Sequence, residues 1–405
     1  MSTDAPAVEP GFGEESLGRR VLDNIRGGNL GSWPVLIGLV VIVVFFSFKA
    51  DNFLSPGNFS NILTQMAGVT LLAYGVVFVL LIGEIDLSIS YISGIAGVVV
   101  AKLTIPDGNE VAGIVAIVLA VAVCALIGAF QGSFVAFIGV PAFVVTLAGY
   151  QIWQGAIQKS IEAEGVIVIQ DTTVNNTANY FFSERAGWIL TAVVLGVYVA
   201  SLVSTFVSHR RHGVAVRDPW LIVVKAVAVV AVAIVVVVIS NRDRGVPFVL
   251  LLMIASLLIL TFVAKRTTFG RHVYAVGGNA EAARRAGINV DRIKIAVFAI
   301  CSLMAALGGI ILASRLRSVD TNAGGGSILL YSIAAAVIGG TSLFGGRGHV
   351  KSALLGALVI VSIDNGLGLL GLGSGQKFVI TGGVLLLAVS VDSISRRGRE
   401  QRGRA

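Results

Sequence analysis

Long apolar segments alternate with shorter polar segments along most of the chain. The twelve apolar segments lie at residues 33–48, 60–82, 88–103, 111–131, 141–158, 188–208, 220–240, 247–264, 295–313, 327–345, 349–370 and 376–392. Most of them approach the roughly 20 residues that an α-helix needs to cross the hydrocarbon of a bilayer. A strand in hydrocarbon would leave its backbone groups unpaired, so these segments are predicted to be helices. The pattern predicts an all-α, polytopic transmembrane bundle of about 10–12 spans, in which the short or glycine-interrupted segments form broken or half-helices.

Composition supports a membrane protein and changes the interpretation of the charge. Hydrophobic residues make up 56% of the 405 residues and charged residues only 13%, about half the charged fraction of an average soluble domain. These values exclude a soluble enzyme, a disordered chain and a secreted disulfide scaffold. The formal net charge of +8 is therefore interpreted as a topology signal and not as a surface for nucleic acid.

Lysine and arginine are concentrated in three polar segments, at residues 209–218, 265–294 and 396–405. The segment 159–187 is acidic instead. Counting twelve spans from a cytosolic start places the three basic segments inside and the acidic one outside, as the positive-inside rule requires. We therefore predict a flexible cytosolic tail at 1–32, a transmembrane domain at 33–395 with a cytosolic loop at 265–294, and a basic cytosolic tail at 396–405.

No nucleotide or metal site is evident in the sequence. The stretch GGRGHVKS (345–352) resembles a phosphate-binding loop, but Val350 stands where the glycine before the lysine is required. The four histidines have no cluster of carboxylates or cysteines that would complete a metal site. No nucleophile and base occur together in one segment. We therefore expect no cofactor, no metal and no enzymatic activity in this chain.

The stretch GEIDLSIS (83–90) places acidic residues between two apolar segments. Charged residues at membrane depth are costly and are therefore candidates for function. An alternative is that Asp86 only caps the helix that follows by accepting a backbone N–H. A helix break at Gly83 would allow Asp86 to cap that helix while Glu84 faces a polar partner. Glu84, Asp86 and Ser88 are predicted to lie at a helix break or along a translocation path.

Two further polar stretches interrupt the apolar segments. Asp364 and Asn365 lie inside the segment 349–370, where such a pair is expected to contact another helix or to line a cavity. NAGGGS (322–327) precedes another apolar run and is either a hinge at a broken helix or a plain extracellular turn.

The cytosolic loop 265–294 contains Glu281-Ala282-Ala283, followed after three residues by Gly287. Such a stretch can start a short helix that the glycine ends. An exposed short helix on the cytosolic face would be a docking surface for a partner. The alternative is an ordinary charged, amphipathic loop.

These motifs together resemble the membrane-spanning permease subunits of bacterial ABC importers for monosaccharides, the ribose/xylose type. The matching stretches are GEIDLSIS (83–90), VPAFVVTLAG (140–149), TFGRHVYAVGGNAEAARRAGINVDRIKIAVFA (268–299), ILASRL (311–316), AAAVIGGTSLFGGRGHV (334–350) and DNGLGLL (364–370). The xylose-type permeases are the most similar members, because they share the pair of spans within 188–240 and the RGVP at 244–247.

The resemblance implies a multi-pass protein of the bacterial cell membrane that cooperates with other chains. A separate ATPase would dock on the cytosolic loop, an extracytoplasmic binding protein would deliver the sugar, and two permease chains, identical in a homodimer, would form the path. The residues expected to couple to the ATPase are Gly277, Gly278, Asn279, Glu281, Ala282, Ala283 and Gly287. Membrane lipid would surround the permease, and nucleic acid is not an expected partner.

The resemblance leaves the sugar open. A xylose-type pentose is the expected substrate, and ribose, arabinose, galactose or another monosaccharide or polyol remain alternatives. A hypothesis from another class is an ion-coupled secondary transporter. Buried acids such as Glu84, Asp86 and Asp364 would be compatible with it, but it leaves the GGNAEAARRAG loop (277–287) unexplained.

The purified chain alone is predicted to release no phosphate from ATP, because it contains no Walker A sequence. The complex with its ATPase subunit is expected to hydrolyse ATP and serves as the positive control. Robust hydrolysis by the isolated chain, after contaminating ATPases have been removed, would contradict this prediction.

Overall fold

The computed structural model describes residues 33–106, 108, 110–211 and 219–400. The main helices of this part are α2 (Trp33–Lys49), α3 (Pro56–Leu81), α4 (Ile89–Leu103), α5 (Gly113–Ser133), α6 (Ala142–Ile161), α8 (Glu184–Arg211), α9 (Pro219–Asn241), α10 (Phe248–Arg266), α13 (Val290–Leu316), α14 (Ile328–Ile338), α15 (Val350–Leu369) and α16 (Ser374–Glu400). Each of them overlaps one of the predicted apolar segments, which confirms the polytopic helical fold. The predicted tail at 1–32, most of the basic loop at 209–218 and residues 401–405 of the basic C-terminal tail lie outside the described residues.

Seven of these helices are long and apolar enough to cross a membrane, and α2, α4, α14 and α16 contain shorter apolar helical stretches. Helix α6 belongs to neither group, although its 20 residues give it the length of a span. Polar residues such as Gln151, Gln154 and Gln158 account for this difference. A membrane helix with such a composition has to place these amides away from lipid.

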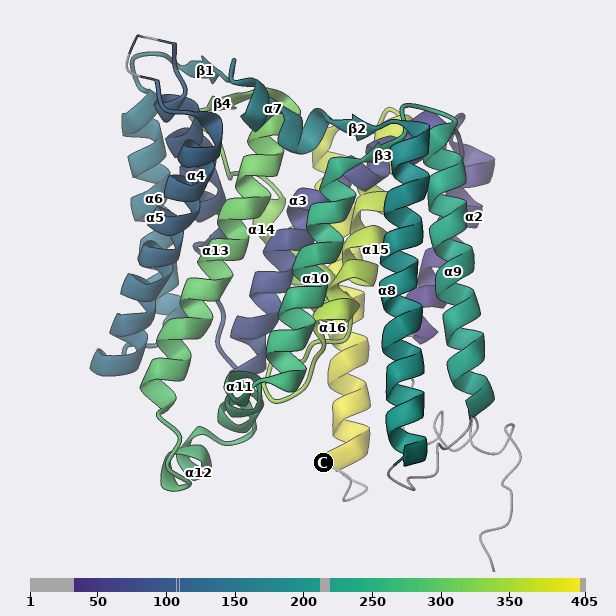
Figure 1. The fold of residues 1–405 in the computed structure, drawn as a ribbon. Helices are drawn as coiled ribbons and strands as arrows, with labels where there is room; N and C mark the ends of the chain where they lie inside the picture. Colours follow the sequence, from purple (N-terminus) through teal and green to yellow (C-terminus); the bar gives the residue numbers. More distant parts are fainter. Residues whose placement is uncertain (1–32, 107, 109, 212–218, 401–405) are drawn as a thin grey trace, which may run out of the picture.

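Short elements occupy the two ends of the bundle (Figure 1). The upper end in that view carries β1 (Val166–Val168) paired antiparallel with β4 (Ser318–Asp320), β2 (Phe181–Phe182) paired antiparallel with β3 (Val246–Pro247), and α7 (Thr172–Asn179). The lower end carries α11 (Thr268–Gly278), α12 (Ala280–Arg285) and the C-terminal end of α16. A single turn of π-helix, η1 (Phe134–Ile138), extends α5. Since α11 and α12 belong to the most basic polar segment and α7 to the acidic one, the positive-inside rule predicts that the lower end faces the cytosol, and the two ends are named accordingly below.

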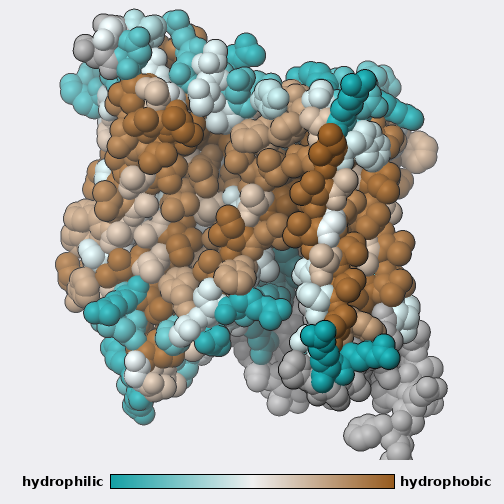
Figure 2. Space-filling model, viewed as in Figure 1, coloured by the Kyte–Doolittle hydropathy of each residue, from teal (hydrophilic) through white to brown (hydrophobic). Residues whose placement is uncertain are grey.

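The outer surface of the bundle is apolar between two hydrophilic ends, as Figure 2 shows. The clearest example is the hairpin of α8 and α9, which is exposed along nearly its whole length. The short ladder between β2 and β3 joins the upper ends of this hairpin, with Phe181 opposite Pro247. Because hydrocarbon solvates such a surface without cost, exposed valines and leucines are expected here.

Helix α13 lies at the centre of the fold and packs against α3, α4 and α5. Glycines bring the backbones of these helices into contact. A Cβ atom on Gly308 of α13 would overlap the α3 backbone at Gly68, and a Cβ atom on Gly128 of α5 would overlap the carbonyl oxygen of Phe298 on α13. Association in lipid depends on close van der Waals packing, so small residues at these crossings hold the bundle together.

The apolar segment predicted at 327–345 is not one continuous span, because α14 ends at Ile338. The following residues form an irregular loop in which Gly340, Gly345 and Gly346 adopt positive φ angles. The preceding stretch 322–327 is not a plain surface turn, since Gly324 packs against the backbone of Ser90 on α4. Ala323 and Gly324 therefore pack on α4, and α14 is a half-helix.

Replacing Gly128 by alanine is predicted to destabilise the bundle, because the new methyl group has to displace the backbone of α13. Overpacking of this kind costs about 1–3 kcal/mol and should lower the midpoint of thermal unfolding in detergent. Gly196→Ala on α8 is the matched control, since nothing lies within 4 Å of the Cβ position there and alanine favours a helix. Equal midpoints for the two variants would contradict the prediction.

Candidate functional site

Helices α11 and α12 form a compact pair on the cytosolic face, and local signals fix both of their ends. The Thr267 hydroxyl accepts a hydrogen bond from the Gly270 N–H at the start of α11. The Asn279 Oδ1 atom accepts a bond of 2.9 Å from the Ala282 N–H and so caps α12. Gly287 follows α12 with a φ of 84°, a backbone conformation that glycine adopts without strain.

The predicted coupling residues fall into two groups. Gly277 and Ala283 face their own protein: a Cβ atom on Gly277 would overlap the carbonyl oxygen of Leu81, and Ala283 is buried. The exposed members of the set are Gly278, Asn279, Glu281, Ala282 and Gly287. Only the second group is available to a partner, whereas the first holds α11 and α12 in place.

Ion pairs join the charged side chains of α12 to each other and to the start of α13. Glu281 pairs with Arg285 at 3.2 Å, one turn away on the same helix, and Arg284 pairs with Asp291 at 3.2 Å. These side chains are largely exposed, so the pairs add little stability. They leave α12 with a surface that carries both signs of charge.

An irregular segment with the sequence GEIDLS separates α3 from α4. In this helix break Gly83 adopts a positive φ of 78°. Glu84 Oε1 pairs with Lys294 Nζ on α13 at 2.6 Å, and both side chains are less than a quarter exposed. Asp86 Oδ1 accepts a hydrogen bond of 2.9 Å from the N–H of Ser88, the residue directly before α4. The two acids of this stretch therefore turn to different neighbours.

Asp86 is almost fully buried and, among the described residues, has no lysine or arginine as a partner. Its Oδ1 atom also accepts a bond of 2.6 Å from the Ser88 hydroxyl, which lies 3.0 Å from Gln131 Oε1 on α5. The thiol of Cys301 lies on its other side.

Asp364 and Asn365 belong to a separate polar network near the extracytoplasmic ends of α3 and α15. Asn365 exchanges two hydrogen bonds of 2.9 Å with Asn58. Asp364 accepts bonds from Gln65 at 3.0 Å and from Tyr331 at 2.9 Å. Asn58 and Gln65 lie in the first turns of α3, whereas Glu84 follows its last residue. The structure therefore does not bring Asp364 and Asn365 together with Glu84, Asp86 and Ser88.

Sequence reasoning missed a further polar region on α6. Gln151, Gly155 and Gln158 are exposed and recur at helical spacing on one face of the helix. A cavity of about 500 Å³ opens there, lined by Gly155, Gln158, Lys159, Glu162 and Thr321. The signal in the sequence was the recurrence of glutamine inside an otherwise apolar segment.

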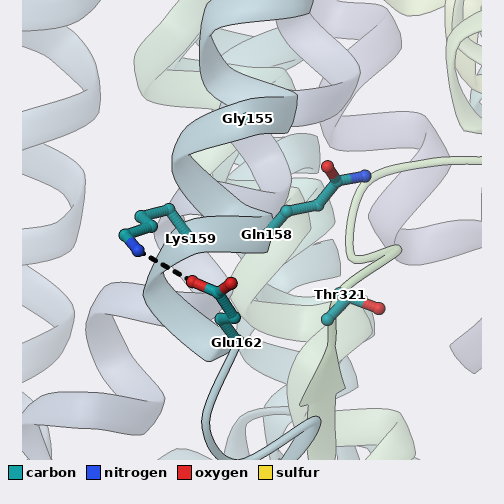
Figure 3. A pocket seen from close by; sticks show the side chains of 5 residues that line it. All are labelled: Gly155, Gln158, Lys159, Glu162 and Thr321. Carbon is teal, nitrogen blue, oxygen red and sulfur yellow. Dashed lines mark hydrogen bonds and ion pairs between the residues drawn. The ribbon is translucent and has the colours of Figure 1, made fainter.

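Figure 3 shows this cavity between α6 and the segment that follows β4. The side chain of Gln158 points toward the segment that carries Thr321, and Lys159 pairs with Glu162 at 2.8 Å beside it. Amide and hydroxyl groups of this kind donate and accept hydrogen bonds, as a polyhydroxylated ligand requires. Among the described residues, no group of three His, Cys, Asp or Glu could hold a metal ion.

Comparisons with known proteins agree with the architecture. The family model described as "Branched-chain amino acid transport system / permease component" matches residues 58–389. The xylose transport system permease protein XylH of Escherichia coli K12 is 36% identical over 381 residues, which cover 92% of this chain and 94% of the relative. The XylH protein of Haemophilus influenzae is 34% identical over 376 residues, covering 92% of this chain and 99% of the relative. The ribose import permease protein RbsC of Escherichia coli K12 is 33% identical over 361 residues, covering 88% of this chain and 92% of the relative. No solved structure matches the chain.

Asp86→Ala is predicted to lower the midpoint of thermal unfolding in detergent, because the Ser88 N–H would lose its acceptor inside the protein, whereas the Ser88 hydroxyl keeps Gln131 Oε1 as an acceptor. A buried polar group without a partner costs about 1–3 kcal/mol. Asp86→Asn retains an acceptor oxygen of the same shape and should lose less. An Asp86→Ala midpoint equal to that of the unmodified chain would show that the carboxyl does not stabilise the break.

Proposed function

Because the chain belongs to the family of branched-chain amino acid transport system / permease components, we propose that it is the membrane-spanning subunit of an ATP-driven importer for a monosaccharide, most closely of the xylose type. The observation that carries this proposal is the 36% identity to a xylose permease along 94% of that protein's length. The relatives reported above are transport permeases for sugars and not enzymes. The chain therefore supplies the path, and ATP is hydrolysed on another subunit.

The ATPase docks on the cytosolic face at α12. This proposal is supported by the exposure of Asn279, Glu281 and Ala282 on a helix that projects from the bundle (Figure 1). The ends of α12 are held by the Asn279 cap and by Gly287, and buried Ala283 fixes it to the protein. A short helix anchored in this way can pass a push from its partner to the membrane domain without bending.

A sugar-binding protein delivers its ligand to the opposite face. The cavity beside α6 supports this proposal, since Thr321 follows directly after β4 at the extracytoplasmic end. The side chains of Gln158 and Thr321 present hydrogen-bonding groups to it, as hydroxyls of a sugar in transit require. Selectivity for the sugar can then rest mainly with the delivering protein.

A second copy of the chain closes the path along α6. The exposed face with Gln151, Gly155 and Gln158 supports this proposal, because amides that faced lipid would lose their hydrogen bonds to water. Helices α5 and α6 lie together at one edge of the bundle (Figure 1), where a second copy has access. Two such faces would enclose a polar passage between two chains.

Vesicles that contain the chain, its ATPase and its binding protein are predicted to take up xylose when ATP is present, even with an uncoupler that abolishes ion gradients. Gly287→Trp should abolish uptake, because the new side chain changes the exposed end of α12. Gly196→Trp is the control, since the Cβ position of Gly196 also has open space around it but lies in the exposed α8–α9 hairpin, away from both ends of the bundle. Uptake that the uncoupler stops while ATP persists would favour an ion-coupled transporter instead.

A further inference from the structure

Three stretches of backbone meet at the cytosolic end of α3 without intervening side chains. The Gly346 N–H donates a hydrogen bond of 2.9 Å to the carbonyl oxygen of Leu81. A Cβ atom on Gly277 of α11 would overlap that same oxygen, and one on Gly345 would lie 3.0 Å from the Gly83 nitrogen. We call the contact of Gly83, Gly277, Gly345 and Gly346 the glycine junction. It seats the end of α3 directly on the helix that precedes α12.

The pair of Glu84 and Lys294 adds a second connection at the same place. The two atoms are 2.6 Å apart, and the residues are separated by 210 positions in the sequence. Lys294 lies in the second turn of α13, whose first turn binds Arg284 of α12 through Asp291. With side chains 23% and 21% exposed, the pair is screened less by water than a surface pair. Separating the two charges would leave each of them partly buried and unpaired.

The break between α3 and α4 also contacts the helices that carry the polar face. The Thr146 hydroxyl of α6 lies 3.4 Å from the carbonyl oxygen of Ile85, and Ser88 contacts Gln131 of α5. The amide of Gln131 in turn packs directly on Gly149 of α6. At one end of this segment Leu81 therefore contacts α11 and Gly83 contacts Gly345, which itself touches Gly277 of α11, and at the other end Ile85 and Ser88 contact α6 and α5.

We infer that residues 82–88 transmit movement of α11 and α12 to α6, with Glu84 and Lys294 as the positioning residues that keep the two ends together. This inference rests on the proposed function. When a partner displaces α12, the glycine junction and the ion pair transmit the displacement to residues 82–88. The contacts at Ile85 and Ser88 then transmit it to α6. Without the ion pair, α12 can still bind the ATPase, but its movement is coupled less tightly to the movement of α6.

The test measures the number of sugar molecules taken up per ATP hydrolysed in vesicles that contain the complete complex. Glu84→Gln and Lys294→Met should each lower this ratio by about fivefold or more, the range of a typical coupling free energy. The ATPase should still purify with both variants. The exchange Glu84→Lys with Lys294→Glu should restore the ratio, and Lys294→Arg, which keeps the charge, should retain it.

Glu164→Gln is the matched control, because it breaks an exposed ion pair with Lys102 of the same kind on the opposite face. Its ratio should equal that of the unmodified chain. The inference is overturned if the single variants keep the ratio, if the charge exchange fails to restore it, or if ATP hydrolysis and uptake fall together in every variant. An unmodified complex without ATP-driven uptake would instead refute the proposed function.

Discussion

Hydrocarbon offers no hydrogen-bond partner to a backbone N–H or C=O group, and the rest of the structure depends on this constraint. Helices satisfy these groups internally, so helices are expected at the lipid-facing surface, and the face drawn in Figure 2 is apolar between its hydrophilic ends. Irregular backbone in the described part of the chain is expected to be covered by protein or reached by water. The break at 82–88, the stretch 322–327 and the loop after α14 all follow this rule, because each packs against helices or against another loop.

The same constraint favours hydrogen bonds between polar side chains of neighbouring helices, as near the extracytoplasmic ends of α3 and α15. Asp364 of α15 accepts hydrogen bonds from Gln65 of α3 and Tyr331 of α14 and so links three helices. Asn365 and Asn58 each donate one hydrogen bond to the other. The glycines at the helix crossings act differently, since they remove side chains so that backbones can touch. Close packing at the glycines sets the distance between helices, and the hydrogen bonds between polar side chains determine which helices are neighbours.

Much of the fold could be predicted from the sequence, because a membrane helix is encoded locally by its length and apolar composition. The ends of α12 could also be predicted, because the neighbouring residues Asn279 and Gly287 determine them. The length of α14 and the packing of 322–327 could not be predicted from neighbouring residues, because they depend on contacts with α4. Lys294, the partner of Glu84, and Gln65, one of the partners of Asp364, lie hundreds of residues away from these acids. A single sequence marks such an acid as a candidate for function but does not identify the side chain that it contacts.

The hairpin of α8 and α9 enters and leaves the membrane on the same side, and the short ladder of β2 and β3 closes it there. An even number of crossings leaves the orientation of every later helix unchanged. A gene could therefore acquire or lose this hairpin in one step and still present α12 to the cytosol. The fold thus separates a core, in which each crossing matters, from a peripheral module that evolution can treat as a single removable unit.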